Sequence, residues 1–188
     1  GDVVLRPSEK GPSHLTMSWM VTEDLITSVL IEEVDDDPQK APSGARLGDR
    51  LRVKIRGQHK EEYGSIDELI ERYVTPMNEN REEMVTHRKF KPGRKQEVRE
   101  SLKDEKIKEP KSMPYALHCY DQATLYPHYF YLSWVPKVKP QKVLIGIVPG
   151  GFCIQLPNMQ WASETHKTME KMLNWFKGNY KKIIQAKD

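Results

Sequence analysis

A long charged stretch near the middle of the chain, "HRKFKPGRKQEVRESLKDEKIKEPKS" at residues 87–112, most constrains what this sequence can fold into. Its apolar residues are sparse, and Pro92 and Pro110 bound its central part. Such a stretch cannot supply the core of a domain, so we interpret it as a linker that holds a helix over residues 94–107. The sequence therefore predicts a domain boundary here, with one small unit on each side.

The composition agrees with two small units. The chain has 188 residues, of which 37% are hydrophobic and 30% are charged. Two small domains have a high surface-to-volume ratio and need this many polar residues. The net charge of +3 is far from the strong basicity of a dedicated nucleic-acid binder. No apolar run would cross a membrane and no signal peptide opens the chain, which begins at Gly1 and is expected to be an excised fragment.

The part before the linker reads as an antiparallel meander. Residues 3–5 are apolar, and residues 14–21 alternate, with one apolar face made by Leu15, Met17, Trp19 and Val21. Further strands are predicted over residues 25–31 and 51–56, separated by an acidic loop over residues 32–44.

A helix is predicted after this meander. Ser65 and Glu68 have the spacing of a capping box, and an apolar stripe follows at residues 66, 69, 70, 73 and 74. We expect Pro76 to interrupt the helix and a second helix to cover residues 77–87.

After the linker the pattern starts again. Strands are predicted over residues 113–120, 128–135, 142–148 and 151–156. A closing helix is expected over residues 165–177, with Gly178 as its stop. Strands followed by a helix, twice over, indicate an imperfect internal duplication.

The sequence offers no catalytic or metal centre. His118 and Cys119 are neighbours on a predicted strand, so their side chains point to opposite faces and cannot readily work together. The spacing of the histidines and of the two cysteines, Cys119 and Cys153, fits neither zinc nor a disulfide framework. We expect no enzyme activity, no metal, no cofactor and a reducing compartment.

Several motifs in order resemble a known family. They are "GDVVLRPSEKGPSHLTMSW" at the start, "SIDELIERYVTPM", "KFKPGRKQEV" in the linker and "LNWFKGNY" near the end. Together they are similar to the tandem Src homology two domains of the Spt-six family of transcription elongation factors and histone chaperones.

The resemblance implies an α+β fold made of two Src-homology-two-like domains, each a central antiparallel sheet flanked by helices. The two domains would pack as one unit through a linker helix. The boundaries would be residues 1–90 for the first domain, from which the family's N-terminal helix is missing, 91–110 for the linker helix and 111–188 for a divergent second domain. The implied function is non-catalytic phosphopeptide binding in the nucleus. The partner would be the phosphorylated linker of the largest subunit of RNA polymerase II, onto which the domains would dock the elongation factor.

The resemblance also assigns a phosphate site. Arg6 would grip the phosphate with its planar guanidinium, helped by the Ser8 hydroxyl and by the backbone N–H groups of Glu9, Lys10 and Gly11. Gly11 would let the loop turn tightly. Two residues depart from the family pattern: Glu9 replaces a small hydroxyl residue, and Ser28 stands where a histidine is common.

The second domain lacks this arginine, because His118 and Cys119 stand in its place. The resemblance implies a different basic surface there. The candidates are Lys177, Lys181 and Lys182 after the closing helix, with Lys137, Lys139 and Lys142 before the strand at residues 142–148.

Three alternatives remain open. The basic residues of the linker could contact nucleic acid weakly, although acidic neighbours dilute them; they are Arg88, Lys89, Lys91, Arg94, Lys95 and Arg99. An enzyme centred on His118 or Cys119 would lose turnover when either is replaced. A structural scaffold would follow if Glu9 disabled the pocket.

Overall fold

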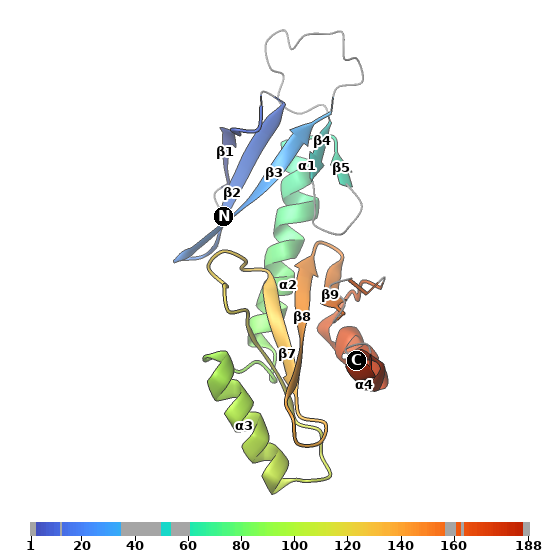
Figure 1. Ribbon diagram of the computed structural model, residues 1–188. Coiled ribbons are helices and arrows are strands. Elements are labelled where there is room, and N and C mark those ends of the chain that lie inside the picture. Colours follow the sequence, from blue (N-terminus) through green and yellow to red (C-terminus); the bar gives the residue numbers. More distant parts are fainter. Residues whose placement is uncertain are drawn as a thin grey trace. The chain divides into compact units, whose positions relative to one another are not determined.

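The computed structural model describes residues 3–11, 13–34, 50–53, 61–156, 161–162 and 164–185. The chain forms two compact units, Gly1–Thr75 and Pro76–Asp188, each of which holds one sheet (Figure 1). The division falls before the charged linker. These units are the parts of the chain that pack most closely within themselves. The domain boundaries at residues 90 and 110, which the resemblance implies, stay a prediction.

The first unit is built on a five-stranded antiparallel sheet in sequential order. Its strands are β1 (Val3–Pro7), β2 (His14–Thr22), β3 (Leu25–Glu33), β4 (Leu51–Val53) and β5 (Glu61–Tyr63). The predicted meander is confirmed. β3 extends through Glu32 and Glu33, which we had expected in a loop, because both residues pair with β4. The other predicted residues of that loop, from 35 onward, and of the strand beyond residue 53 lie outside the described residues.

One face of this sheet forms the core of the unit. The alternation predicted for β2 is confirmed, since Leu15, Met17 and Trp19 are buried. The helix after β5 covers this face, and the ring of Tyr73 meets the ring of Trp19 edge-on at 6.1 Å. The opposite face of the sheet is open, and it carries polar side chains together with exposed apolar ones such as Val4 and Ile26.

That helix begins at Ser65, whose Oγ accepts from the N–H of Glu68 at 3.1 Å. The Glu68 carboxylate accepts in return from Gly64, one residue before the position that a capping box predicts. The elements are α1 (Ile66–Leu69), the π-helical turn η1 (Ile70–Val74) and α2 (Thr75–Thr86).

The prediction that Pro76 interrupts the helix is wrong. The three elements are continuous, and in η1 the N–H of Thr75 donates to the carbonyl of Ile70, five residues back. A proline inside a regular α-helix clashes with the carbonyl four residues before it. The wider π turn relieves that crowding, so the helix passes through the proline.

The second unit holds a four-stranded antiparallel sheet, again in sequential order. Its elements are α3 (Lys95–Lys108), β6 (Tyr115–Cys119), β7 (Tyr129–Trp134), β8 (Gln141–Val148), β9 (Gly151–Gln155) and α4 (Met169–Gln185). All four strands and the linker helix agree with the prediction.

Helices cover both faces of this sheet (Figure 1). On one face Ala116 packs with Val98 and Leu102 of α3. On the other face, Trp134 meets the ring of Phe176 of α4 at 4.9 Å. The α+β fold expected from the sequence is therefore observed.

The ends predicted for the closing helix are wrong. α4 starts at Met169 rather than residue 165, and it runs through Gly178 to Gln185. Gly178 sits between the buried side chains of Phe176 and Ile183, so packing on both sides holds the helix together where the glycine weakens it. Among the described helices, none has the length and apolar character needed to cross a membrane.

Candidate phosphate-binding sites

Arg6 lies near the end of the edge strand β1, on the face of the sheet opposite the core. It pairs in register with Thr16 of β2, whose neighbours Leu15 and Met17 point into the core. The Arg6 side chain is exposed, and among the described residues its guanidinium has no hydrogen-bond or ion-pair partner. The five donors of this group are therefore free for a ligand.

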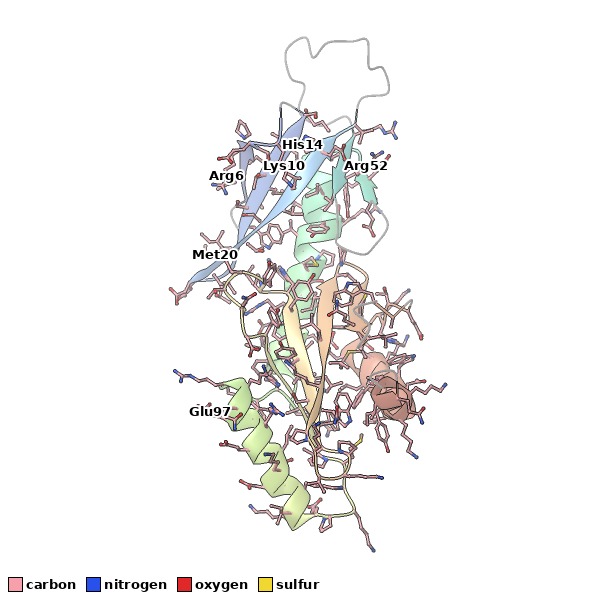
Figure 2. All side chains as sticks on the ribbon, in the orientation of Figure 1. Arg6, Lys10, His14, Met20, Arg52 and Glu97 are labelled. Carbon is pink, nitrogen blue, oxygen red and sulfur yellow. The ribbon has the colours of Figure 1, made fainter. Side chains whose placement is uncertain are left out.

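The loop after Arg6 is a tight turn held by hydrogen bonds of its own backbone. Figure 2 labels Arg6 before this loop, Lys10 within it and His14 after it. Ser8 donates its N–H to the carbonyl of His14 at 2.9 Å, and His14 donates to the carbonyl of Gly11 at 3.1 Å. Gly11 has a φ of 130°, as expected for a glycine that allows the turn. The N–H groups of Lys10 and Gly11 point inward to Ser8, at 3.3 Å from its Oγ and 3.4 Å from its carbonyl oxygen.

This geometry changes the predicted nest of backbone donors. Two of its three N–H groups, those of Lys10 and Gly11, already have an acceptor inside the loop. The side chains of Glu9 and Lys10 are exposed. A phosphate at this loop would thus meet the Arg6 guanidinium and the Ser8 hydroxyl first.

His14 is a further candidate that the sequence analysis did not assign to the site. It stands opposite Ser8 at the start of β2, on the same face as Arg6 and Thr16, and its ring is partly exposed. Its Nδ1 lies 3.2 Å from the Oγ of Ser13. The period of two along β2 placed His14 on this face, so the signal was in the sequence.

Ser28 also lies on this face. Its hydroxyl lies 2.7 Å from that of Ser18, its partner across the β2–β3 ladder. Two hydroxyl groups that contact each other therefore stand on this face of the sheet.

A row of charges crosses the sheet beside His14. In register it runs from His14 through Glu32 and Arg52 to Glu62. Hydrogen bonds from Arg50 and Arg52 lower the pKa of the exposed Glu62 carboxyl to about 2. These two arginines are thus already engaged, whereas the Arg6 guanidinium has no partner among the residues that the structure describes.

At the position in the second unit that matches Arg6, the chain has a histidine. His118 is the fourth residue of β6, as Arg6 is of β1. Its side chain is 0% exposed, and its Nε2 lies 2.9 Å from the Oγ of Ser133. Burial lowers the pKa of His118 to about 4, so the ring is neutral at pH 7 and does not attract an anion.

An internal carboxylate lies beside His118. Lys95 of α3 pairs with Asp121 at 2.8 Å, and the Tyr131 hydroxyl donates to the same carboxylate at 3.3 Å. Lys142 stands over the Tyr131 ring at 4.0 Å. The chain thus supplies its own anion beside His118, and the lack of an ordinary phosphate pocket here stays a prediction.

A second cluster of cations forms around Tyr115. The ammonium groups of Lys89 and Lys177 lie 5.1 Å and 5.7 Å from the centre of this ring. Arg88 and Lys177 line a neighbouring cavity of about 340 Å³. Residues from the linker and from α4, far apart in sequence, therefore meet at one place.

The other lysines proposed for the second unit are dispersed. Lys181 lies one turn beyond Lys177 on α4 and shares its side, whereas Lys182 is rotated away from it by helical geometry. Lys137 and Lys139 line a separate cavity, described below.

The basic residues of the linker also do not form one continuous surface. Lys91 pairs with Glu105 and donates to the Oγ of Ser101, and Lys95 pairs with Asp121. These two cations are neutralised within the unit, while Arg88 and Lys89 belong to the cluster around Tyr115. In the described part of the chain, no three potential metal-ligating side chains come together.

Comparison with known proteins assigns the family. A model of the SH2 (Src homology two) domain family matches residues 1–179. The chain therefore belongs to the SH2 domain family.

Its relatives are transcription elongation factors of the Spt6 type. It is 30% identical over 152 residues to the SPT6-like elongation factor of Arabidopsis thaliana, and 27% identical over 187 residues to SPT6 of Drosophila melanogaster. These alignments cover 81% and 96% of this chain but 11% and 9% of those proteins, so the chain spans a small part of its relatives.

Solved structures of tandem SH2 domains also match the chain. A tandem SH2 domain of Spt6, described as binding the phosphorylated C-terminal repeat domain of RNA polymerase II, matches with a TM-score of 0.76 and 25% identity, over 100% of this chain and 86% of that one. The tandem SH2 domains of Spt6 from Antonospora locustae match with a TM-score of 0.63 and 16% identity, over 94% and 81%, which supports the fold. The predicted resemblance is confirmed.

Proposed function

We propose that this chain is a non-catalytic phosphopeptide reader. It docks a nuclear elongation factor and histone chaperone onto the phosphorylated linker, next to the C-terminal repeat domain, of the largest subunit of RNA polymerase II. The observation that carries the proposal is the exposed guanidinium of Arg6, which lies beside Ser8 and His14 and has no acceptor among the described residues.

The chemistry at Arg6 suits a phosphorylated side chain. A phosphate monoester carries about −1.5 to −2 charges and three acceptor oxygens. A guanidinium binds two of those oxygens in a fork, which an ammonium group cannot do. The open face of the sheet leaves space for a peptide strand to lie across Thr16 and the paired hydroxyl groups of Ser18 and Ser28.

The cluster around Tyr115 supports a second phosphate contact. Lys89 and Lys177 meet there with Arg88, and this surface contains Lys177, one of the residues proposed from the sequence. One peptide that engages two weak sites gains affinity because its second contact is intramolecular. We therefore propose a doubly phosphorylated ligand.

The test is a titration followed by fluorescence anisotropy. A polymerase linker peptide, phosphorylated and unphosphorylated, is added to the wild type and to Arg6→Ala at fixed salt. Charge-assisted hydrogen bonds contribute about 1.5–3 kcal/mol each, so Arg6→Ala should weaken binding on the order of 10–100-fold. Arg6→Lys should recover part of this loss because it restores charge without the fork.

The matched control is Arg72→Ala. Arg72 is an exposed arginine of the same unit, but it lies on η1 and pairs with Glu68. Its removal should leave phosphopeptide affinity unchanged. Equal affinity for the two peptides, or equal losses in the two alanine variants, would refute the assignment of Arg6. Steep weakening with salt, independent of phosphorylation, would instead favour the nucleic-acid alternative.

A further inference from the structure

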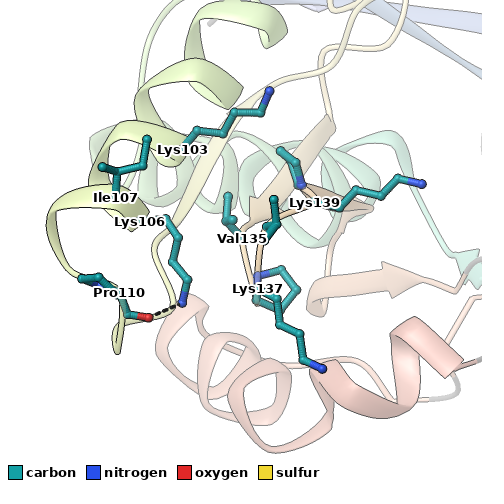
Figure 3. Close-up of a pocket in the computed structure, with 10 residues that line it drawn as sticks. Lys103, Lys106, Ile107, Pro110, Val135, Lys137 and Lys139 are labelled. Atoms are coloured by element: carbon teal, nitrogen blue, oxygen red, sulfur yellow. Dashed lines mark hydrogen bonds between the residues drawn. The ribbon is translucent and has the colours of Figure 1, made fainter.

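A cavity of about 880 Å³ lies in the second unit between the end of α3 and the loop that joins β7 to β8 (Figure 3). Its walls are mainly aliphatic. Val135 is buried at its base, while Ile107 and Val138 are 75% and 85% exposed. The loop carries a proline at each end, Pro136 and Pro140, and the fixed φ of proline limits how far such a loop can rearrange. The apolar surface is thus presented to solvent rather than folded away.

Four lysines surround this apolar surface, from α3 (Lys103, Lys106) and from the loop (Lys137, Lys139). No acidic side chain lines the cavity among the described residues. The ammonium group of Lys106 donates to the carbonyl of Pro110 at 2.8 Å (Figure 3) and to the carbonyl of Ser112 at 2.6 Å. Both acceptors are neutral, so they leave its charge uncompensated. The other three form no ion pair with any residue that the structure describes.

We propose that this cavity docks an extended acidic peptide segment that inserts one aliphatic side chain between Ile107 and Val138. The aliphatic walls would bury that side chain, and the lysines around them would meet the flanking carboxylates. A single-stranded nucleic acid fits less well, because none of the described residues that line the cavity has an aromatic ring on which a base could stack.

This site is separate from the two proposed phosphate contacts. Neither Arg6 nor the cluster around Tyr115 lines it, and its chemistry asks for carboxylates and one apolar anchor rather than for a phosphate. The proposal therefore goes beyond phosphopeptide reading. It predicts that an unphosphorylated acidic peptide binds this unit.

The probe is the unphosphorylated peptide Asp-Glu-Asp-Leu-Asp-Glu-Asp, titrated into the full chain labelled with nitrogen-15 and followed by NMR. We expect the amide signals of residues 103–110 and 135–140 to shift together. Val138→Asp removes the apolar wall and adds a repelling charge, so it should weaken binding about tenfold or more. Replacing the leucine of the peptide by serine should weaken binding to the wild type about as much.

The matched control is Leu125→Asp. Leu125 is 70% exposed, like Val138, but it does not line the cavity. Both positions are on the surface, so folding should be unaffected, which thermal unfolding checks. The proposal is overturned if Val138→Asp and Leu125→Asp have equal effects, if the serine peptide binds as well as the leucine peptide, or if the shifts fall elsewhere. Shifts at these amides with oligouridylate but not with the peptide would also overturn it, in favour of a nucleic acid.

The same titration separates this proposal from phosphopeptide reading. Arg6→Ala should leave binding of the acidic probe unchanged, because Arg6 belongs to the other unit and to a different chemistry. Loss of probe binding in Arg6→Ala would mean that the peptide binds the phosphate site, and the cavity would then have no assigned ligand.

Discussion

Lowering the pH from 7 to 5 should destabilise the second unit, because two of its histidines are held neutral. Burial lowers the pKa of both His118 and His128 from 6.5 to about 4. For His118, Lys142 and Lys95 lower the pKa further, while Asp121 and the hydrogen bond to the carbonyl of Cys119 raise it. In the unfolded chain each ring takes up a proton near pH 6.5, and in the folded chain it does so near pH 4.

The sign and the size follow from these values. A folded-state pKa below the unfolded one gives stability that is present above about pH 6.5 and is lost as the pH falls towards 4. At about 1.4 kcal/mol per pKa unit, one such histidine loses roughly 2 kcal/mol between pH 7 and pH 5. Two of them lose roughly 4 kcal/mol, a large share of the 5–15 kcal/mol of a typical domain. Glu62, with its pKa of about 2, contributes its own loss only below the pH range of this experiment.

The assay is urea unfolding at pH 7 and pH 5, followed by tryptophan fluorescence, with the wild type and His118→Gln in parallel. Gln cannot be protonated, so this variant should lose roughly 2 kcal/mol less between the two pH values than the wild type. Its stability at pH 7, where both side chains are neutral, serves as the control for lost packing against Ser133. Equal pH dependence in the two proteins would refute the view that His118 is neutral and buried in the folded state.

Further predictions concern the second phosphate contact and two glycines. Lys177→Ala should weaken binding of a doubly phosphorylated linker peptide several-fold, on the order of 1 kcal/mol. Lys182 lies on the other side of α4, so Lys182→Ala should leave this affinity unchanged. Anisotropy titrations measure both, and equal effects would remove Lys177 from the site. Gly11→Ala should lower the free energy of unfolding by about 1–2 kcal/mol, because a φ of 130° strains alanine. The strain lies in the backbone, since nothing lies within 4 Å of the new methyl group. An unchanged melting temperature would show that the loop relaxes freely. Gly178→Ala should raise the free energy of unfolding by up to about 1 kcal/mol, because alanine favours a helix interior. The added methyl group meets no atom within 4 Å. A lower melting temperature would contradict this prediction.

The strands could be predicted because their signal is local. Leu15, Met17 and Trp19 alternate with polar residues, and a strand with one buried face requires that period. The helix ends were less predictable. Pro76 and Gly178 are breakers by their own propensity, but a π turn accommodates the first and the buried Phe176 and Ile183 compensate for the second. Such compensation depends on neighbours in space, which propensity does not contain.

The candidate site likewise has a part that the sequence predicts and a part that depends on the folded conformation. The motif around Arg6 is contiguous, so the chain itself carries the residue, its loop and the glycine that turns it. His14 was on the same face by simple alternation and could have been assigned with it. The acceptors that the N–H groups of Lys10 and Gly11 find inside the loop could not be predicted, because hydrogen bonds within a turn depend on its final conformation.

By itself, the sequence determined the family, the two strand-rich parts with their helices, and the place at a strand end of the arginine that we propose holds an anion. Only the tertiary structure decided which basic residues lie together and which are paired with acidic side chains. Lys89 and Lys177 meet over Tyr115, Lys95 is neutralised by Asp121, and Lys137 joins α3 at an aliphatic cavity. The physical reason is that a lysine has the same charge wherever it stands in the sequence. Its availability to a ligand depends on the partners that folding brings within a few ångströms of it.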